Sequence, residues 1–271
     1  MATVLLCALT LALAVFALTQ RRLLWGVIGV GVHSLALAAV YLFLAAPDVA
    51  LTEAAIGFGL VTFVYLLALR RTGRLVVAAS ETYPILHQEG ERIAGLEWEI
   101  LSRFGRSLHR DVEVLWVPRS EIPRLLASAE ADLAAGGFLP RDGETALLSF
   151  PLVPTRLVTV RTGPGPLGAV AGDRGQDHLP SEGRTYEDHE ALVRAIAAGE
   201  LGGAVVDLLR ARQWFLEGRL RDAEMVPIED GLAFRFAVSP GEGETHAALE
   251  EFLRGLSSSG ELSKLVEEHL R

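Results

Sequence analysis

The N-terminal part of the chain contains long stretches without a charged side chain. Residues 2–19 and 23–47 carry no Asp, Glu, Lys or Arg, and residues 49–69 carry only Glu53. About 20 consecutive apolar residues in a helix span the hydrocarbon core of a bilayer. The three stretches therefore predict three transmembrane helices joined by short connections. A cleaved signal peptide is the alternative for the first stretch, although its arginines follow the apolar run instead of preceding it.

Charge separates this apolar part from the rest of the chain. Residues 1–74 carry five arginines and two acids, a net charge of +3, whereas the remainder carries 20 basic and 32 acidic side chains, a net charge of −12. This contrast predicts a membrane domain over residues 1–72 and a soluble domain over residues 73–271. An acidic chain without a basic stripe is a poor nucleic-acid binder. The single cysteine, Cys7, excludes a disulfide framework and a cysteine-based zinc cluster.

The arginines of the apolar part predict its orientation. Arg21 and Arg22 lie between the first two helices, and three further arginines follow the third helix within residues 70–74. With three helices, both groups lie on one side of the membrane, and the other side has no Lys or Arg. The positive-inside rule then places the N-terminus outside the cell membrane and residues 73–271 in the cytoplasm.

Three titratable side chains of the apolar part are candidates for ion translocation: Glu53, His33 and Asp48. A carboxylate in a lipid-facing helix costs about 2.5–3.5 kcal/mol, so such a group usually faces a protein interior or an ion path. Two alanines and Gly57 flank Glu53 at helical spacing, and small residues let another helix approach closely. The alternatives are a snorkelling Glu53, a hydrogen-bonded structural His33 and a solvated helix-cap Asp48.

The sequence around Glu53 carries a family resemblance. Residues 46–57, Ala-Pro-Asp-Val-Ala-Leu-Thr-Glu-Ala-Ala-Ile-Gly, closely resemble the signature of the MbhD-like module. That three-helix module is a small subunit of membrane-bound energy-converting hydrogenases and forms part of the large subunit of Mrp-type sodium/proton antiporters. The resemblance covers roughly residues 1–70. It implies ion translocation inside a larger complex of membrane subunits, with Glu53 as the matching carboxylate.

Helical and strand-like patterns alternate through the rest of the chain. Helical periodicity predicts helices over residues 93–109, 120–130, 187–199, 207–219 and 245–270. Apolar runs predict strands over residues 74–80, 112–117, 132–138, 156–161, 167–171, 203–206, 224–228 and 232–238. Strands that alternate with helices indicate an α/β fold.

Motifs that carry catalytic chemistry are absent from the sequence. Residues 163–168, Gly-Pro-Gly-Pro-Leu-Gly, formally match G-x-G-x-x-G, but two prolines and the lack of a following helix exclude a dinucleotide-binding turn. The seven histidines are scattered without ligand spacing, and there is no nucleophile elbow, P-loop or H-E-x-x-H. We therefore expect neither enzymatic activity nor a bound cofactor or metal ion.

A second resemblance is carried by six stretches in their order and spacing: residues 74–86, 95–104, 131–137, 149–152, 203–207 and 249–270. Together they resemble the family 3 solute-binding proteins, which have the type 2 periplasmic-binding-protein fold, and in particular the non-catalytic N-terminal domain of MltF-type lytic transglycosylases. The resemblance implies two α/β lobes around a hinged cleft. The first lobe comprises residues 74–158 and 234–271, and the second comprises residues 159–233.

The same resemblance implies a ligand site in that cleft. Binding proteins of this family hold an amino-acid zwitterion with an arginine at its carboxylate and an aspartate at its amine, through charge-assisted hydrogen bonds. Arg141 and Asp207 are the matching candidates, and Tyr83 and Trp98 are candidates for the cleft walls. Arg141 departs from the family spacing by about one position, and the usual threonine is missing from residues 136–140. The alternatives are a surface arginine, a helix N-cap for Asp207 and a core tryptophan.

These patterns favour one function and leave two alternatives. The favoured function is a membrane subunit of a cation/proton antiporter or hydrogenase-like complex, whose soluble domain senses a solute or docks a partner. The first alternative is a membrane-anchored amino-acid or solute receptor without a role in transport. The second is a scaffold with an empty cleft. The side of the membrane stays open, because solute-binding domains normally work outside the membrane whereas the arginines place residues 73–271 inside.

Overall fold

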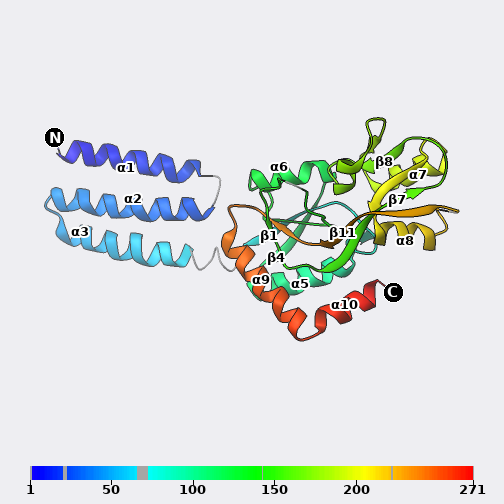
Figure 1. Ribbon diagram of the computed structural model, residues 1–271. Coiled ribbons are helices and arrows are strands. Elements are labelled where there is room, and N and C mark those ends of the chain that lie inside the picture. The colour runs from blue at the N-terminus through cyan, green and yellow to red at the C-terminus, as the bar shows by residue number, and fades with distance from the viewer. Residues whose placement is uncertain (1, 21–22, 66–72, 142, 221, 271) are drawn as a thin grey trace. The chain divides into compact units, whose positions relative to one another are not determined.

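The computed structural model describes residues 2–20, 23–65, 73–141, 143–220 and 222–270. The chain divides into two units, Met1–Gly73 and Arg74–Arg271 (Figure 1). Four of the five arginines that predict the membrane orientation lie outside the described residues: Arg21, Arg22, Arg70 and Arg71.

The first unit consists of α1 (Ala2–Thr19), α2 (Leu23–Phe43) and α3 (Pro47–Thr52), and α3 continues as a π-helix, η1 (Glu53–Val61). The middle helix, α2, contacts both α1 and the α3–η1 helix. Pro47 begins α3, where the missing N–H of proline costs no helical hydrogen bond. The sequence predicts a helix in this third stretch, but nothing in its periodicity indicates the π segment.

Two helices in the described part of this unit are long and apolar enough to cross a membrane, Leu24–Phe43 and Pro47–Tyr65. The apolar helix Leu6–Thr19 is shorter. Large apolar side chains on all three helices are exposed, for example Leu18 at 86% and Leu51 at 73%. A helix that is apolar on all sides is normally covered by protein or by lipid. The unit therefore leaves apolar surface that its own helices do not bury.

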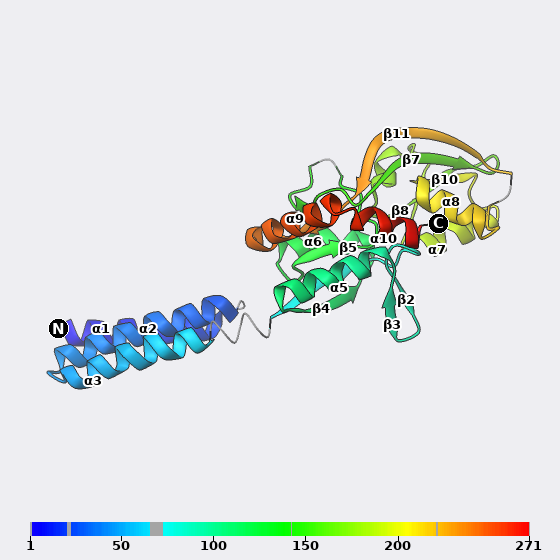
Figure 2. The ribbon, with the colours of Figure 1, turned by 90° about the horizontal axis from the view of Figure 1, so that it is seen from below.

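The second unit begins with a five-stranded sheet in the order β4-β1-β5-β12-β6. Its strands are β1 (Arg74–Ala79), β4 (Asp111–Trp116), β5 (Leu133–Ala135), β6 (Leu147–Leu148) and β12 (Ala237–Val238). β1 runs parallel to β4 and β5, whereas β12 is antiparallel to β5 and β6. A small hairpin, β2 (His87–Glu89) and β3 (Arg92–Ala94), projects from this lobe (Figure 2).

Helices cover both faces of this sheet. α5 (Leu96–Leu108), α9 (Gly243–Ser258) and α10 (Glu261–His269) lie on one face, and α6 (Ile122–Ala127) lies on the other (Figure 1). The side chains of β1 alternate between the two layers, as the period of a strand requires. Leu75 and Val77 enter the core with α5 and α9, and Ala78 packs against α6.

The second lobe is built on a sheet in the order β11-β7-β10-β8-β9. Its strands are β7 (Val153–Arg161), β8 (Leu167–Val170), β9 (Arg184–Tyr186), β10 (Gly203–Asp207) and β11 (Glu224–Phe234). The helices α7 (His189–Ala197) and α8 (Leu208–Leu216) pack on it around a separate core. Two 3-10 turns, η2 (Arg119–Glu121) in the first lobe and η3 (Arg174–His178) in the second, complete the unit.

Two long strands join the lobes. β7 and β11 pair antiparallel from Val153 opposite Phe234 to Arg161 opposite Glu224. Val153 and Phe234 belong to the core of the first lobe, whereas Val158 belongs to that of the second. Each strand therefore passes from one core into the other, which gives the two-lobed α/β architecture that the sequence predicts.

The structure corrects two of the predicted helices. The helix predicted over residues 245–270 is broken into α9 and α10 at Gly260, whose φ of 75° lies in the left-handed region that favours glycine. The helix predicted from residue 93 begins at Leu96, because Arg92–Ala94 pairs with β2 instead. Short paired strands of this kind carry too few residues to show a clear period.

Candidate functional site

Glu53 lies at the start of η1 and points to the neighbouring helix α2. The hydroxyl of Ser34 on α2 donates a hydrogen bond to Glu53 Oε1. Ser34 is buried, at 5% exposure, and Glu53 is partly buried. The carboxylate is therefore held inside the helix contact, and the π-helical turn that begins there is a feature that often marks functional positions.

Gly57 makes this contact possible. A Cβ atom at this position would collide with Ser34 Oγ and lie 2.6 Å from Glu53 Oε1. Ala50, one turn before Glu53, is buried at 4% exposure. The small residues that flank Glu53 thus let α2 approach the carboxylate within the unit itself.

We expect Gly57→Ala to impair ion exchange strongly, because the added methyl group displaces either Ser34 or Glu53. Gly59→Ala is the matched control on the same helix, since the nearest atom to its Cβ would be Ala54 O at 3.8 Å. Both variants are compared in membrane vesicles at equal membrane levels of the protein. Equal activity of the two variants would show that the close contact has no role in exchange.

None of the described hydrogen bonds joins His33 or Asp48 to Glu53. His33 Nδ1 lies 2.9 Å from Thr10 O and so links α2 to α1. Asp48 lies in the exposed first turn of α3. These contacts fit a structural histidine and a solvated helix-start aspartate, and a role for either residue in ion translocation stays a prediction.

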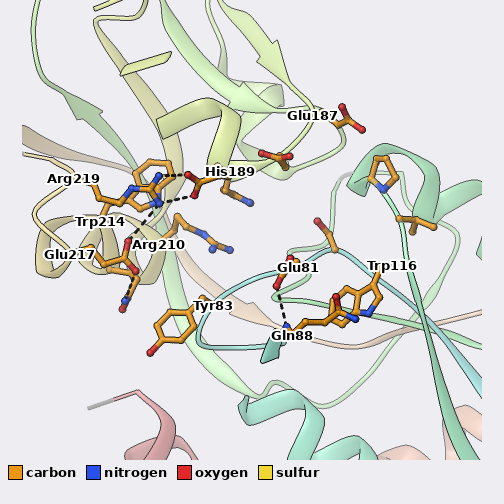
Figure 3. A pocket seen from close by; sticks show the side chains of 16 residues that line it. Glu81, Tyr83, Gln88, Trp116, Glu187, His189, Arg210, Trp214, Glu217 and Arg219 are labelled. Carbon is orange, nitrogen blue, oxygen red and sulfur yellow. Dashed lines mark hydrogen bonds and ion pairs between the residues drawn. The ribbon is translucent and has the colours of Figure 1, made fainter. Parts of the chain in front are cut away.

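In the second unit, a cleft of about 530 Å³ opens between the lobes (Figure 3). The first lobe contributes residues after β1 and the end of β4, among them Glu81, Tyr83 and Trp116. The second lobe contributes the start of α7, one face of α8 and the turn after α8, among them His189, Arg210 and Arg219. In α/β sheets, ligands bind beyond the carboxyl ends of parallel strands, which is where β1 and β4 end.

The four predicted ligand residues do not meet in this cleft. Tyr83 lines it and is 51% exposed. Asp207 caps α8 by accepting a hydrogen bond from the Arg210 backbone N–H at 2.8 Å. Arg141 forms an ion pair with Asp177, and its Nε donates to Asp177 Oδ2 at 2.8 Å. Trp98 packs against the core of the first lobe. Ligand binding by these residues stays a prediction.

A buried charge network crosses between the lobes beside the cleft. Arg119, at 1% exposure, donates to Gly136 O at 2.5 Å, and its Nε lies 3.0 Å from Asp173 Oδ1. Asp173 in turn lies 3.1 Å from Nε2 of the buried His189. Burial disfavours the charge of Asp173, yet Arg119 and His189 outweigh it and hold the pKa of this carboxyl well below its usual range. We call Arg119, Asp173 and His189 the interlobe latch.

Further contacts hold the same side of the unit closed. The Arg141–Asp177 pair joins the first lobe to η3. Arg174 donates to Pro140 O at 2.6 Å and pairs with Glu229 at 2.6 Å. Backbones also meet there, because a Cβ at Gly172 would lie 2.7 Å from Ser120 N. The lobes are therefore in direct contact through the chain's own side chains and backbone.

Glu97 supports this region from within the first lobe. Its fully buried carboxylate accepts hydrogen bonds from Gly136 N at 2.5 Å and Gly137 N at 3.1 Å. Gly136 has φ of 98°, and a Cβ there would collide with Ser80 O. Burial raises the pKa of Glu97 to about 7, although the two backbone N–H groups oppose this shift. Gly137 also has a positive φ, of 68°, so the turn favours glycine at both positions.

Glu97 predicts a pH dependence of stability near neutrality. The pKa of Glu97 is raised from 4.5 to about 7 in the folded state. Between these two pH values the folded protein therefore keeps a proton on this carboxyl that the unfolded chain has lost. The free energy of unfolding then falls, by up to about 1.4 kcal/mol per pH unit, as the pH rises from 4.5 to 7. The difference between wild type and Glu97→Gln, measured by chemical unfolding from pH 5 to 8, should show this slope. A pH-independent difference would contradict it.

The residues of the latch, and Glu97 and Arg210, have no assigned role in the sequence-based prediction. Arg119 and Asp173 stand far apart in the chain, and an arginine after a Val-Pro dipeptide is no motif. Glu97 lies in a stretch that carries the solute-binding resemblance. That stretch predicts its place in the fold but not its role. In the described part of the chain, no three His, Cys, Asp or Glu side chains gather as metal ligands would.

Comparison with known families identifies the N-terminal part. Residues 8–74 match the family model MbhD, which describes the D subunit of MBH. The N-terminal unit is thus similar to the MbhD family. The match ends at Arg74, the first residue of the second unit, and it includes Ser34, Glu53 and Gly57. No curated protein matches the chain.

Solved structures match about three quarters of the chain. An ancestral arginine-binding protein bound to arginine is 15% identical, with 75% of this chain and 100% of that chain covered and a TM-score of 0.67. The amino acid ABC transporter substrate-binding protein AbpA from Streptococcus pneumoniae, bound to L-arginine, is 18% identical, with 73% and 94% covered and a TM-score of 0.65.

A third structure is the arginine-, lysine-, histidine-binding protein ArtJ from Geobacillus stearothermophilus. It is 14% identical, with 72% of this chain and 94% of that chain covered and a TM-score of 0.65. At such identities the likeness shows the fold. The predicted fusion of an MbhD-like module with a periplasmic-binding-protein-like fold is thus confirmed.

Proposed function

We propose that the chain is an integral membrane subunit of a cation/proton antiporter or an energy-converting hydrogenase-like complex. The observation that carries this proposal is the MbhD match over residues 8–74, within which Glu53 is held against Ser34. In this proposal all three helices of the module span the membrane, and Glu53 binds and releases the translocated ion. The chain itself performs no enzymatic reaction.

Purification of the tagged chain in mild detergent tests the proposal. The exposed apolar surface of the module needs cover from lipid or from other membrane helices, and a module of this family works inside a larger assembly. We expect further integral membrane subunits of an antiporter or hydrogenase type to co-purify. Two results together would refute the proposal. The chain would purify alone, and cells that lack its gene would show normal exchange.

We propose that the second unit senses a small solute such as an amino acid in the interlobe cleft, or docks a partner subunit. The cleft of about 530 Å³ falls within the range of small-molecule pockets, roughly 300–1,000 Å³. The fold likeness to arginine-binding proteins adds support. The competing function is a membrane-anchored solute receptor whose helices serve only as an anchor. A scaffold is the third function, and the interlobe latch favours it, because the latch joins the lobes through the chain's own side chains.

The side of the membrane on which this unit works can be tested directly. We propose the cytoplasm, from the positive-inside rule, against the periplasm expected by analogy with solute-binding proteins. A cysteine placed at the exposed Glu182 in a Cys7→Ala background is treated with a membrane-impermeant thiol reagent. We expect labelling in inverted vesicles but not in intact spheroplasts. The reverse pattern would place the unit in the periplasm.

A further inference from the structure

Among the described residues that line the interlobe cleft, the buried Arg210 is a cation whose guanidinium makes no hydrogen bond or ion pair, although the carboxylates of Asp207, Asp173 and Glu217 attract its charge. Arg210 on α8 is 8% exposed and lines the cleft, and Figure 3 shows its guanidinium reaching into the open space. Its Nε has no hydrogen-bond partner, and no described hydrogen bond or ion pair engages the rest of the group. Burial lowers the pKa of Arg210, although these three carboxylates oppose this shift. A buried charge without a partner is costly and needs a reason.

The other cations of the cleft are already engaged. Arg219 pairs with Glu190 at 2.5 Å and with Glu217 at 3.7 Å. His189 belongs to the interlobe latch. Among the described residues that line the cleft, Arg210 is therefore the cation that remains available to an incoming anion.

An available carboxylate lies on the opposite lobe. Glu81 lines the cleft from the loop after β1, and among the described contacts it accepts one hydrogen bond, from the Gln88 backbone N–H at 3.0 Å. No described cation pairs with it. Figure 3 shows Glu81 and Arg210 facing the same space, with Tyr83 beside them. Glu187 of the second lobe is a further cleft carboxylate that no described cation pairs with, so Arg210 and Glu81 are the free charges of opposite sign that lie on opposite lobes.

We propose that Arg210 binds the carboxylate of a free amino acid in this cleft and that Glu81 receives its ammonium group. The inference rests on the proposed solute-binding role of the second unit. Its polarity is the reverse of the sequence-based prediction, in which Arg141 of the first lobe holds the carboxylate and Asp207 of the second lobe holds the amine. Both of those side chains are engaged elsewhere, with Asp177 and with the α8 backbone.

Calorimetric titration of the full chain in lipid nanodiscs tests the assignment. The probes are L-arginine and L-histidine, with agmatine and histamine as their counterparts that lack the carboxylate. Arg210→Gln should weaken amino-acid binding by at least about tenfold, as loss of a charge-assisted bond implies, and should leave amine binding unchanged. Arg212→Gln is the matched control, an exposed arginine on the same helix, and should bind as wild type does. Glu81→Gln should weaken binding of the amino acids.

Thermal unfolding without ligand separates this role from a structural one. Burial outweighs the attraction of the nearby carboxylates for Arg210, so removal of this charge should leave the melting temperature of Arg210→Gln equal to or above that of wild type. A lower melting temperature with unchanged affinity would overturn the proposal. Affinity lost in Arg141→Gln and kept in Arg210→Gln would also overturn it, while solute binding itself would stand. If neither amino acid binds wild type, the amino-acid site is refuted together with solute sensing, and the transport role is judged separately on Glu53.

Discussion

Glu53→Gln is expected to reduce cation/proton exchange by the complex to background. Glutamine has nearly the same shape and keeps an oxygen that can accept the Ser34 hydroxyl hydrogen bond, so the helix contact should persist. It cannot bind and release a proton, and it offers no negative charge to a cation. Exchange is measured in inverted membrane vesicles from ΔpH collapse after addition of Na⁺ or K⁺, with growth under salt or alkaline stress as the cellular readout.

The control for this variant lies one residue earlier. Thr52 is exposed, and its hydroxyl bonds only to carbonyls of its own helix, Asp48 O at 3.0 Å and Val49 O at 2.9 Å. Thr52→Val should leave exchange unchanged, while immunoblots confirm equal amounts of all variants in the membrane. Normal exchange in Glu53→Gln would favour the anchored-receptor function, because a bare anchor needs no carboxylate within a close helix contact.

Much of the Glu53 site could be predicted from the sequence, because membrane helices leave a strong local signal. The stretches without charged side chains predicted where the helices lie. The small residues around Glu53 predicted that another helix approaches closely. The partner of Glu53 could not be predicted. Ser34 stands among many small and apolar residues of α2, and only the packing of two helices decides which of them meets the carboxylate. The π-helical segment also leaves no mark in the periodicity of the sequence.

The order of elements in the second unit was also accessible from the sequence. Periods of 3.6 and 2 residues are visible wherever a segment is long enough and buried on one face, as in α5, α9 and β7. They fail at two- and three-residue strands such as β6 and β9. The helical period also continues through Gly260, where the structure breaks the helix, because the residues on both sides keep a helical pattern.

The ligand site was the least predictable part of the molecule. Family spacing pointed to Arg141 and Asp207, but spacing does not say whether a charged group is free. The structure shows that Arg141 pairs with Asp177 and that Asp207 caps α8. Arg119 and Arg210 are buried by contacts that join distant segments, and a lone arginine in a sequence gives no sign of burial. Electrostatic partnership is a property of the folded chain, so these residues had no local signal.

The interlobe latch leads to the second large expected effect. Arg119→Met should lower the free energy of unfolding of the second unit by about 3–5 kcal/mol, because it leaves Asp173, whose side chain is only 20% exposed, without its main counter-charge. For a unit of this size the loss corresponds to a melting temperature lower by about 6–20 °C. The measurement is thermal unfolding of the full chain in detergent, followed by hydrogen exchange of peptides from both lobes.

An exposed pair across the same lobes provides the control. The side chains of Arg141 and Asp177 are 35% and 40% exposed, against 1% for Arg119. Arg141→Met should therefore cost at most about 1 kcal/mol. Addition of Asp173→Asn to Arg119→Met should restore part of the loss, since it removes the uncompensated charge. A loss no larger than that of Arg141→Met would refute the latch.

The pH dependence supplies an independent check on the latch. The folded-state pKa of Asp173 is depressed, so its stabilising contribution is fully present above its ordinary value of 3.8 and is lost as the pH falls below it. In Arg119→Met the depression of this pKa should largely vanish, and the midpoint of acid unfolding should move to higher pH.

The latch also bears on how a ligand would bind. Asp173 and His189 stand next to the cleft that Arg210 lines. Lobes that are held together by the chain's own charges would therefore present a preformed cleft. An amino acid would then bind without the large closure that an open two-lobed protein requires.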